Sequence, residues 1–406
     1  MVAPARASQV RQSNLALVLD LVRRDGPMSR SAIVAATGLT RSAIAGLLGE
    51  LEALRLVVEA VPSSDGSPGR PSPVARVDER HVGALAVEVF IDEIGVSIVS
   101  LDGAIVTSVR KVRSRRRLSL ANTVRDVVQL VQSVDSERLR AGRGGIERTL
   151  VGVGVSVPGL VRQADNTIVV APNLGWSEAD FAGPLAAALG GNLPIHVGND
   201  ADLGARAESR FGAGVGANNL LYVSGEVGVG GGVVIDGSPL IGHSGYAGEI
   251  GHFPVNPNGR NCRCGAIGCW ETEVGEQALL RRAGLPEDGG TSALERLFEM
   301  ADAGERQALA ALDEEARWLA IGLTGLINVF DPDRVVLGGL LGRLLPYVEE
   351  RLLSELRQRR FRDVPRNIAV LGASLGASAT TVGAAELAFD ALTRDPAGVS
   401  LMLWGA

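Results

Sequence analysis

The chain has 406 residues, of which 46% are hydrophobic and 21% charged, and its formal net charge is −6. This length predicts two or three domains. A mildly acidic chain offers nucleic acid no overall attraction, so a nucleic-acid site needs a local basic patch. No long apolar run and no secretory signal occur, so we predict no membrane span and a cytoplasmic protein.

The first 60 residues carry the patterns of three helices. Residues 14–26 place leucine and valine at helical spacing and end on Gly26. Ser29 and Thr40 are the predicted N-caps of two further helices, which a short break at Gly38 separates. This is the spacing of a helix-turn-helix. Residues 57–78 predict two strands around a tip rich in Pro, Gly and Ser. We therefore expect an N-terminal winged helix-turn-helix, mainly α, over residues 1–78.

Five residues of this segment are candidate contacts to double-stranded operator DNA. Thr40, Arg41 and Ser42 open the third helix, where a recognition helix meets base edges in the major groove. Arg30 could contact a phosphate, and Arg70 at the wing tip suits a minor groove. The alternative is a small helical cap on an enzyme with solvated arginines. The order of helices, caps and wing favours DNA.

A second basic run, RKVRSRRR, covers residues 110–117. It follows a predicted strand and precedes a predicted helix. Charges at an exposed strand protect a sheet edge from pairing with another chain. We favour this interpretation over a second DNA contact.

From residue 79 onward, strand and helix patterns alternate, which predicts an α/β protein built from two related halves. We place the first half at residues 79–195 and expect a C-terminal helix, about 380–406, to complete it. The second half spans residues 196–380.

All three cysteines of the chain, Cys262, Cys264 and Cys269, lie within eight residues. His252 lies upstream on a glycine-flanked turn. Zn²⁺ prefers four tetrahedral Cys and His ligands, and clustered cysteines in a reducing compartment favour metal over disulfides. We predict a structural Zn²⁺ site in loop 252–269, because four protein ligands leave the metal no open position. Free structural cysteines are the alternative.

The segment EIGHFPVNPNGRNCRCGAIGCWE resembles the signature of the ROK family (repressors, open reading frames, kinases). The segments APNLGW, GNDADLGARAE and DPDRVVLGGLLG are similar to ROK segments and occur in ROK order. The resemblance implies an α/β two-lobed domain of the actin-like sugar kinase (ribonuclease H-like) type. The N-terminal winged helix is similar to the repressor branch, which includes xylose and N-acetylglucosamine repressors.

The resemblance also implies a hexose between the two halves of the ROK domain. The matching positions are Asn173, Asn199, Asp200, Glu249, His252 and Glu271. Such side chains supply the paired donors and acceptors that sugar hydroxyls require. Asp200 matches the catalytic base of ROK kinases, but we expect it to accept a hydroxyl rather than to act as a base.

The phosphate loop of ROK kinases, Asp-x-Gly-Gly-Thr, is altered in this chain. Glu88 stands for the Asp, and Phe90, Ile91 and Asp92 stand for Gly-Gly-Thr. A side chain in place of glycine fills the space where backbone amides would approach phosphate. Val227 replaces a Thr of the second phosphate loop.

These features predict a DNA-binding regulator without enzyme activity, most simply a repressor of carbohydrate-use genes that a sugar or sugar phosphate releases. The family implies a homodimer or homotetramer. The alternative is an active ROK sugar kinase with an added DNA-binding domain. The sequence leaves open which sugar binds and whether it induces or co-represses.

Overall fold

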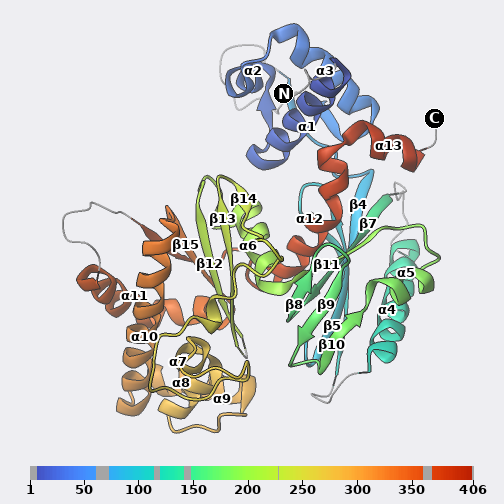
Figure 1. Cartoon of the computed structure of the whole chain (residues 1–406). Coiled ribbons are helices and arrows are strands. Elements are labelled where there is room, and N and C mark those ends of the chain that lie inside the picture. Colours follow the sequence, from blue (N-terminus) through green and yellow to red (C-terminus); the bar gives the residue numbers. More distant parts are fainter. Residues whose placement is uncertain are drawn as a thin grey trace. The chain divides into compact units, whose positions relative to one another are not determined.

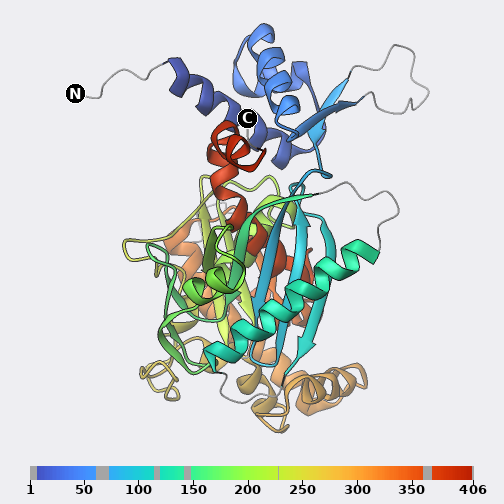
Figure 2. The same cartoon turned by 90° about the vertical axis from the view of Figure 1, so that its right-hand side faces the viewer.

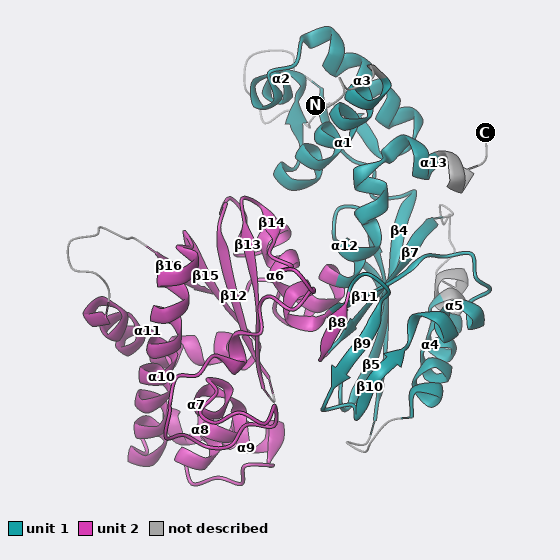
Figure 3. Cartoon of the chain, in the orientation of Figure 1, with its two compact units in different colours: residues 1–157, 163–198, 384–406 teal, residues 158–162, 199–383 magenta. Residues whose placement is uncertain are grey.

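The computed structural model describes residues 7–60, 73–113, 119–140, 148–226, 228–359 and 368–404. The chain forms two compact units (Figure 3). Unit 1 comprises Met1–Val157, Gln163–Gly198 and Ala384–Ala406, and unit 2 comprises Pro158–Arg162 and Asn199–Gly383.

Three helices and a small sheet form the N-terminal segment of unit 1 (Figure 1). Its elements are α1 (Ala7–Asp25), β1 (Met28–Ser29), α2 (Arg30–Thr37), α3 (Arg41–Ala53), β2 (Val57–Ala60) and β3 (Val74–Val77). The strands form an antiparallel sheet in the order β1-β3-β2. Helices α2 and α3 meet at 113° across a three-residue break.

The predicted caps account for where α2 and α3 begin. Ser29 Oγ accepts a hydrogen bond from the Ala32 amide, and Thr40 Oγ1 accepts one from the Ala43 amide, each at 3.2 Å. Both cap residues are extended, as N-caps usually are. The left-handed Gly38 ends α2. The two predicted N-caps are therefore confirmed.

The rest of unit 1 is built on a five-stranded sheet in the order β11-β7-β4-β5-β6. This part of unit 1 contains the strands of that sheet, β4 (Val82–Val89), β5 (Glu93–Ser100), β6 (Ile105–Val112), β7 (Thr149–Val157) and β11 (Ile195–Asn199). It also contains the helices α4 (Leu120–Arg140) and α5 (Ala182–Ala188) and the strand pair β9 (Thr167–Ala171) and β10 (Trp176–Asp180). Every residue of β4 is buried, as expected for a central strand covered on both faces. Figure 2 shows α4 lying across one face of this sheet.

Unit 2 contains a second five-stranded sheet, in the order β14-β13-β12-β15-β16. The strands of unit 2 are β8 (Leu160–Arg162), β12 (Leu220–Gly225), β13 (Val229–Ile235), β14 (Ser238–Pro239), β15 (Arg334–Gly338) and β16 (Ala369–Gly372). Its two 3-10 helices are η1 (Ile250–His252) and η2 (Gly376–Ser378). Its helices are α6 (Asp200–Phe211), α7 (Glu271–Val274), α8 (Glu276–Arg282), α9 (Gly290–Asp302), α10 (Arg306–Phe330) and α11 (Gly339–Arg359).

The two sheets share one topology. In each, the first strand pairs antiparallel with the second and parallel with the fourth, so both sheets read third-second-first-fourth-fifth in chain order. This repetition confirms the prediction of an α/β chain with two related halves.

Helix α12 (Ala379–Arg394) begins in unit 2 and continues in unit 1, and α13 (Pro396–Trp404) follows it. Close backbone approaches at two glycines, Gly383 and Gly154, position α12. A Cβ on Gly383 would lie 2.0 Å from Leu203 O of α6, within unit 2. A Cβ on Gly154 of β7 would lie 1.7 Å from Ala384 O, within unit 1. No other residue type fits these approaches without a backbone shift.

The basic run at residues 110–117 begins on β6, an edge strand of the first sheet. Lys111 Nζ lies 2.7 Å from Asp126 Oδ1 of α4, so this charge pairs within its own unit. Residues 114–118 lie outside the described residues. An edge strand with charged side chains agrees with the interpretation favoured from the sequence.

Among the described residues, no single helix is long and apolar enough to cross a membrane. Helices α2 and α3 reach that length and hydropathy only as a bent pair.

Two glycine substitutions test the packing of α12. Gly154→Ala is expected to lower the free energy of unfolding by about 2 kcal/mol or more, because its methyl group collides with the backbone of Ala384. The matched control is Gly49→Ala on α3, where nothing lies within 4 Å, and which should stabilise by roughly 0.5–1 kcal/mol. Urea unfolding of both variants measures the difference. Equal effects would contradict the close approach of β7 and α12.

Candidate functional site

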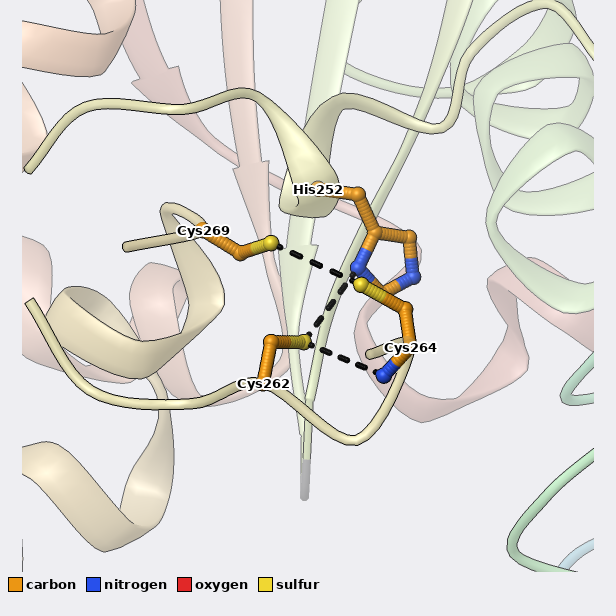
Figure 4. Close-up of side chains that lie close together, drawn as sticks. All are labelled: His252, Cys262, Cys264 and Cys269. Carbon is orange, nitrogen blue, oxygen red and sulfur yellow. Dashed lines mark hydrogen bonds between the residues drawn. The ribbon is translucent and has the colours of Figure 1, made fainter. Parts of the chain in front are cut away.

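A tight loop in unit 2 brings the three cysteines and one histidine together (Figure 4). All four ligand atoms of His252, Cys262, Cys264 and Cys269 lie within 4.8 Å of one another. The loop closes through backbone bridges between Asn261 and Ile267 and between Pro254 and Cys269.

The spacing of the ligand atoms suits a tetrahedral metal. Cys264 Sγ lies 3.6 Å from Cys269 Sγ, and Cys262 Sγ lies 3.6 Å from His252 Nδ1. Tetrahedral Zn²⁺ at its usual bond lengths places two sulfurs about 3.8 Å apart and sulfur and nitrogen about 3.6 Å apart. The donor set and the spacing both fit the predicted metal, so the four residues form a candidate metal centre.

Glycine makes the tight turn of this loop possible. Gly268 has φ +71°, and a Cβ there would lie 1.6 Å from Asn256 O, so no side chain fits. The adjacent Cys269 is fully buried, Cys262 is nearly so, and Cys264 is exposed. Burial raises the pKa of the Cys262 thiol, and the carboxylate of Glu271 raises it further. Cys262 Sγ donates a hydrogen bond to Glu271 Oε1 at 2.9 Å.

The loop is anchored to the helices below it in two ways. Trp270 is fully buried, and its indole N–H donates to Trp318 O of α10 at 3.0 Å. Arg282 of α8 donates to the buried carboxylates of Glu315 and Glu273, at 2.9 and 3.1 Å. Glu273 in turn accepts from the side-chain amide of Asn256 in the loop, at 2.8 Å. These hydrogen bonds therefore hold the loop against α7, α8 and α10.

Two carboxylates lie near His252. Its Nδ1 faces the sulfur atoms, whereas its Nε2 lies 3.8 Å from Glu249 Oε2. Glu271 Oε1 lies 4.0 Å from Nδ1. The structure thus brings together three of the predicted sugar-binding residues, His252, Glu249 and Glu271.

The start of α6 adds two acids to this unit, and their charges interact with Glu249. Burial raises the pKa of Asp200 to about 6, and Glu249 contributes to the rise. Burial raises the pKa of Asp202 to about 8, with further contributions from Glu249 and Asp200. Burial also raises the pKa of Glu249, and Glu271 adds to it. Asp202 was not among the predicted site residues, although it stands two positions after Asp200 in the motif GNDAD.

The two predicted asparagines have different surroundings. Asn199 is the N-cap of α6: its Oδ1 accepts from the amides of Ala201 and Asp202, and its Nδ2 donates to Gly159 O at 3.0 Å. Both ends of its side chain therefore hold the backbone, and its predicted sugar contact stays a prediction. Asn173 lies in the turn between β9 and β10, in unit 1, and its role likewise stays a prediction.

The segment that the family resemblance aligns with the kinase phosphate loop forms the turn between β4 and β5. Phe90, Ile91 and Asp92 make this turn, which a hydrogen bond from the Phe90 amide to Glu93 O closes at 2.9 Å. The guanidinium of Arg110 binds Glu88 at 2.8 Å and also binds Glu93. Glu88 and Glu93 are therefore both paired with an arginine of strand β6.

The predicted DNA contacts lie on the N-terminal segment. Arg41 and Ser42 are exposed at the start of α3, and the Thr40 hydroxyl is occupied as its cap. Arg30 Nε donates to Glu59 Oε1 at 2.8 Å, so a phosphate contact would have to displace Glu59. Arg70 and Val227 lie outside the described residues.

Comparison with known proteins covers nearly the whole chain. Over 382 residues the chain is 29% identical to the xylose repressor of Bacillus subtilis, covering 94% of this chain and 96% of that protein. It is 25% identical to the DNA-binding transcriptional repressor Mlc of Escherichia coli, covering 94% of each. The glucokinase of Streptomyces coelicolor is 32% identical over 256 residues, which are 59% of this chain and 80% of the glucokinase.

Solved structures agree with the fold. A ROK family transcriptional regulator, described as a homologue of the E. coli Mlc protein, matches 97% of this chain and 98% of its own at a TM-score of 0.78 and 23% identity. The ROK glucokinase of Streptomyces griseus, in complex with glucose and AMPPNP, matches at a TM-score of 0.64 and 28% identity, covering 75% of this chain and 98% of its own. The predicted actin-like sugar kinase type of α/β fold is thereby confirmed. The model of the ROK family matches residues 85–391, and the chain belongs to the ROK family.

Proposed function

We propose that this chain is a sugar-responsive, DNA-binding transcriptional regulator, and that a sugar in its ROK domain releases it from the operators of carbohydrate-use genes. One observation carries the proposal. The xylose repressor covers 94% of the chain, whereas the glucokinase structure, matched over 98% of its own length, leaves a quarter of this chain uncovered. The family match begins only at residue 85. The N-terminal segment therefore distinguishes this chain from the kinases.

The geometry of the N-terminal segment supports a winged helix-turn-helix. Helices of this motif meet at about 90–120° across a short turn, and α2 and α3 meet at 113°. The sheet β1-β3-β2 supplies the base of a wing between β2 and β3. In this proposal α3 is the recognition helix, Arg41 and Ser42 reach base edges, and Arg30 contacts phosphate. Arg70 remains the proposed minor-groove contact of the wing.

The candidate metal centre supports a structural Zn²⁺ held by His252 and the three cysteines. Such an ion would bind the Cys262 sulfur as a thiolate, so Glu271 would lose its thiol partner and become available to a hydroxyl group. Nδ1 of His252 would face the metal, which leaves the Nε2 side, next to Glu249, for a ligand. The chain would in this way couple metal binding to the orientation of both carboxylates.

The sugar site in this proposal is formed by Asp200, Glu249, His252 and Glu271, with Asn199 and Asn173 as further contacts. The protonation of the acids decides what each can offer. A neutral carboxyl both donates and accepts a hydrogen bond, whereas an ionised one only accepts. Asp202, with a pKa of about 8, is neutral at pH 7 and completes a mixed set of donors and acceptors beside Asp200.

An active sugar kinase is the second candidate, because Asp200 occupies the position of the kinase base and glucokinases are among the relatives. The β4–β5 turn argues against it. Phe90 and Ile91 replace two glycines, and Arg110 ties Glu88 and Glu93 together where the kinase loop would approach phosphate. Release of ADP from Mg-ATP with D-glucose or D-xylose would favour the kinase, and no release above that of an Asp200→Asn variant would favour the regulator.

We assign each proposed function to one of the predicted domains. Residues 1–78 bind DNA, residues 79–195 with the C-terminal helix form the first ROK lobe, and residues 196–380 form the second lobe with the metal loop. Two copies, as a homodimer or within a homotetramer, would present two recognition helices to a pseudo-palindromic operator. Sugar binding can release DNA only to the extent that the sugar binds the released state more tightly than the DNA-bound state.

Arg41→Ala tests the recognition helix. The variant should bind DNA about 10- to 100-fold more weakly, because it loses a base contact, while its thermal stability stays unchanged. The probe is duplex DNA that the unaltered chain selects from a random pool, and fluorescence anisotropy measures the affinity. Arg317→Ala, which removes an exposed arginine from unit 2, is the matched control. Equal affinities of both variants would contradict the assignment of α3.

Asp202→Asn tests the protonation of the site. The unfolded chain ionises this carboxyl near its ordinary pKa of 3.8, whereas the folded chain holds the proton to about pH 8. The folded state therefore binds more protons between these values, and the unaltered chain loses stability relative to the amide variant as pH rises. The melting temperature of Asp202→Asn relative to that of the unaltered chain should therefore be higher at about pH 8 than at about pH 5. Asp288→Asn, an exposed site, should show no such trend. A pH-independent difference for Asp202→Asn would contradict the raised pKa.

A further inference from the structure

A buried ion pair joins the N-terminal segment to α12 within unit 1. Arg23 Nη2 of α1 lies 2.5 Å from Glu386 Oε1, and the two side chains are only 1% and 2% exposed. The same guanidinium donates from Nε to Leu101 O at 3.0 Å and stacks 5.3 Å from the ring centroid of Phe389. Arg23 therefore contacts the ROK part of the unit at three points.

The neighbouring arginine shows how selective this contact is. Arg24 is half exposed and pairs with Asp25 of its own helix. Burying a guanidinium and a carboxylate requires the loss of their hydration, so a buried pair adds little net stability compared with apolar side chains of the same size. Its better supported use is to fix one arrangement of the elements that it joins. Arg23 is thus suited to fix the N-terminal segment on α12.

The other end of α12 reaches the start of α6. Gly383, three residues before Glu386, approaches the backbone of Leu203 so closely that no Cβ fits. Leu203 lies one turn after Asp200 and directly after Asp202. The acids of the proposed sugar site, α6 and the first residues of α12 are therefore linked by contacts within unit 2.

Contacts within the N-terminal segment connect α1, which carries Arg23, to the proposed recognition helix α3. Helix α1 packs on α3, and both helices bury apolar side chains, among them Leu15, Val18, Leu19, Ile44, Leu48 and Leu51. Arg11 of α1 also pairs with Glu50 of α3 at 2.6 Å. A shift of α1 would therefore carry α3 with it.

We propose that Arg23 and Glu386 are the positioning residues through which the sugar-binding state of unit 2 reaches the DNA-binding segment. Helix α12 is the connecting element, since its first turn belongs to unit 2 and its remainder, with Glu386, belongs to unit 1. The inference rests on the proposed function and names the contact that the release of DNA requires. Coupling of this kind is a free energy between two sites, which substitution of the connecting contact should reduce.

The test compares the double variant Arg23→Met/Glu386→Met with Arg24→Met, a change of the same type at the adjacent exposed arginine. Methionine replaces both charges with apolar side chains of similar length, so neither variant leaves a buried charge unpaired. The measurement is the ratio of the dissociation constants for selected duplex DNA with and without D-xylose or D-glucose at millimolar concentration. Hydrogen exchange of residues 7–60, with and without the sugar, is the second readout.

We expect the unaltered chain and Arg24→Met to lose DNA affinity by about 10-fold or more on sugar addition, within the usual range of allosteric coupling. The double variant should bind DNA and sugar but change its DNA affinity by less than about 2-fold, and its exchange pattern should not respond to sugar. A double variant that responds like the unaltered chain overturns the inference. If the double variant does not fold, Glu386→Gln, which keeps the shape of the side chain, is judged by the same two outcomes.

Failure of the proposed function gives a different result. If the unaltered chain binds its selected DNA but responds to neither sugar in affinity or exchange, the proposed function falls and the inference falls with it. If the unaltered chain responds and the double variant responds equally, only the inference falls.

Discussion

The geometry of the candidate site depends on one constraint: loop 252–269 contains few apolar side chains and must be held by its ligand atoms and its anchors. Three sulfurs and one imidazole nitrogen lie within 4.8 Å of one another, while Trp270 fixes the end of the loop in the core. His252 joins this cluster to Glu249, and Cys262 joins it to Glu271. Two of the proposed sugar contacts, Glu249 and Glu271, therefore lie directly beside candidate metal ligands.

A second constraint concerns α12. Adjacent residues, Gly383 and Ala384, form backbone-to-backbone approaches to α6 in one unit and to β7 in the other. Such approaches resist gradual deformation, because packed backbones have no free space to absorb a shift. Glu386 lies on the same helix, within one turn of Gly383.

Much of the fold and of the candidate metal centre could be predicted from local sequence. The caps Ser29 and Thr40, the cluster of three cysteines and the repeated strand pattern each depend on residues close in the chain. The contacts that arise from tertiary packing could not be predicted this way. Arg23 and Glu386 are 363 positions apart, and nothing in the sequence around Arg23 distinguishes it from Arg24. Likewise, the pairing of Arg110 with Glu88 and of Arg30 with Glu59 appears only when strands and helices are assembled.

Residue type alone does not show which backbone groups a polar side chain holds. Asn199 is predicted to contact sugar, and the structure adds that its amide also holds backbone groups at the start of α6. Asp202 carries no motif signal beyond its spacing from Asp200, and its raised pKa depends on burial and on Glu249, which lies 47 positions further along the chain.

The claim that the metal centre organises the sugar site is tested most directly by thermal unfolding of zinc-loaded protein with D-xylose and with D-glucose, compared with Cys264→Ser. A sugar at about a hundred times its dissociation constant stabilises the native state by about 2.7 kcal/mol, a shift of a few degrees. We predict that one of the sugars shifts the zinc-loaded protein and that neither shifts Cys264→Ser. An equal shift in both proteins would show that the sugar site forms without the metal, and would contradict the account.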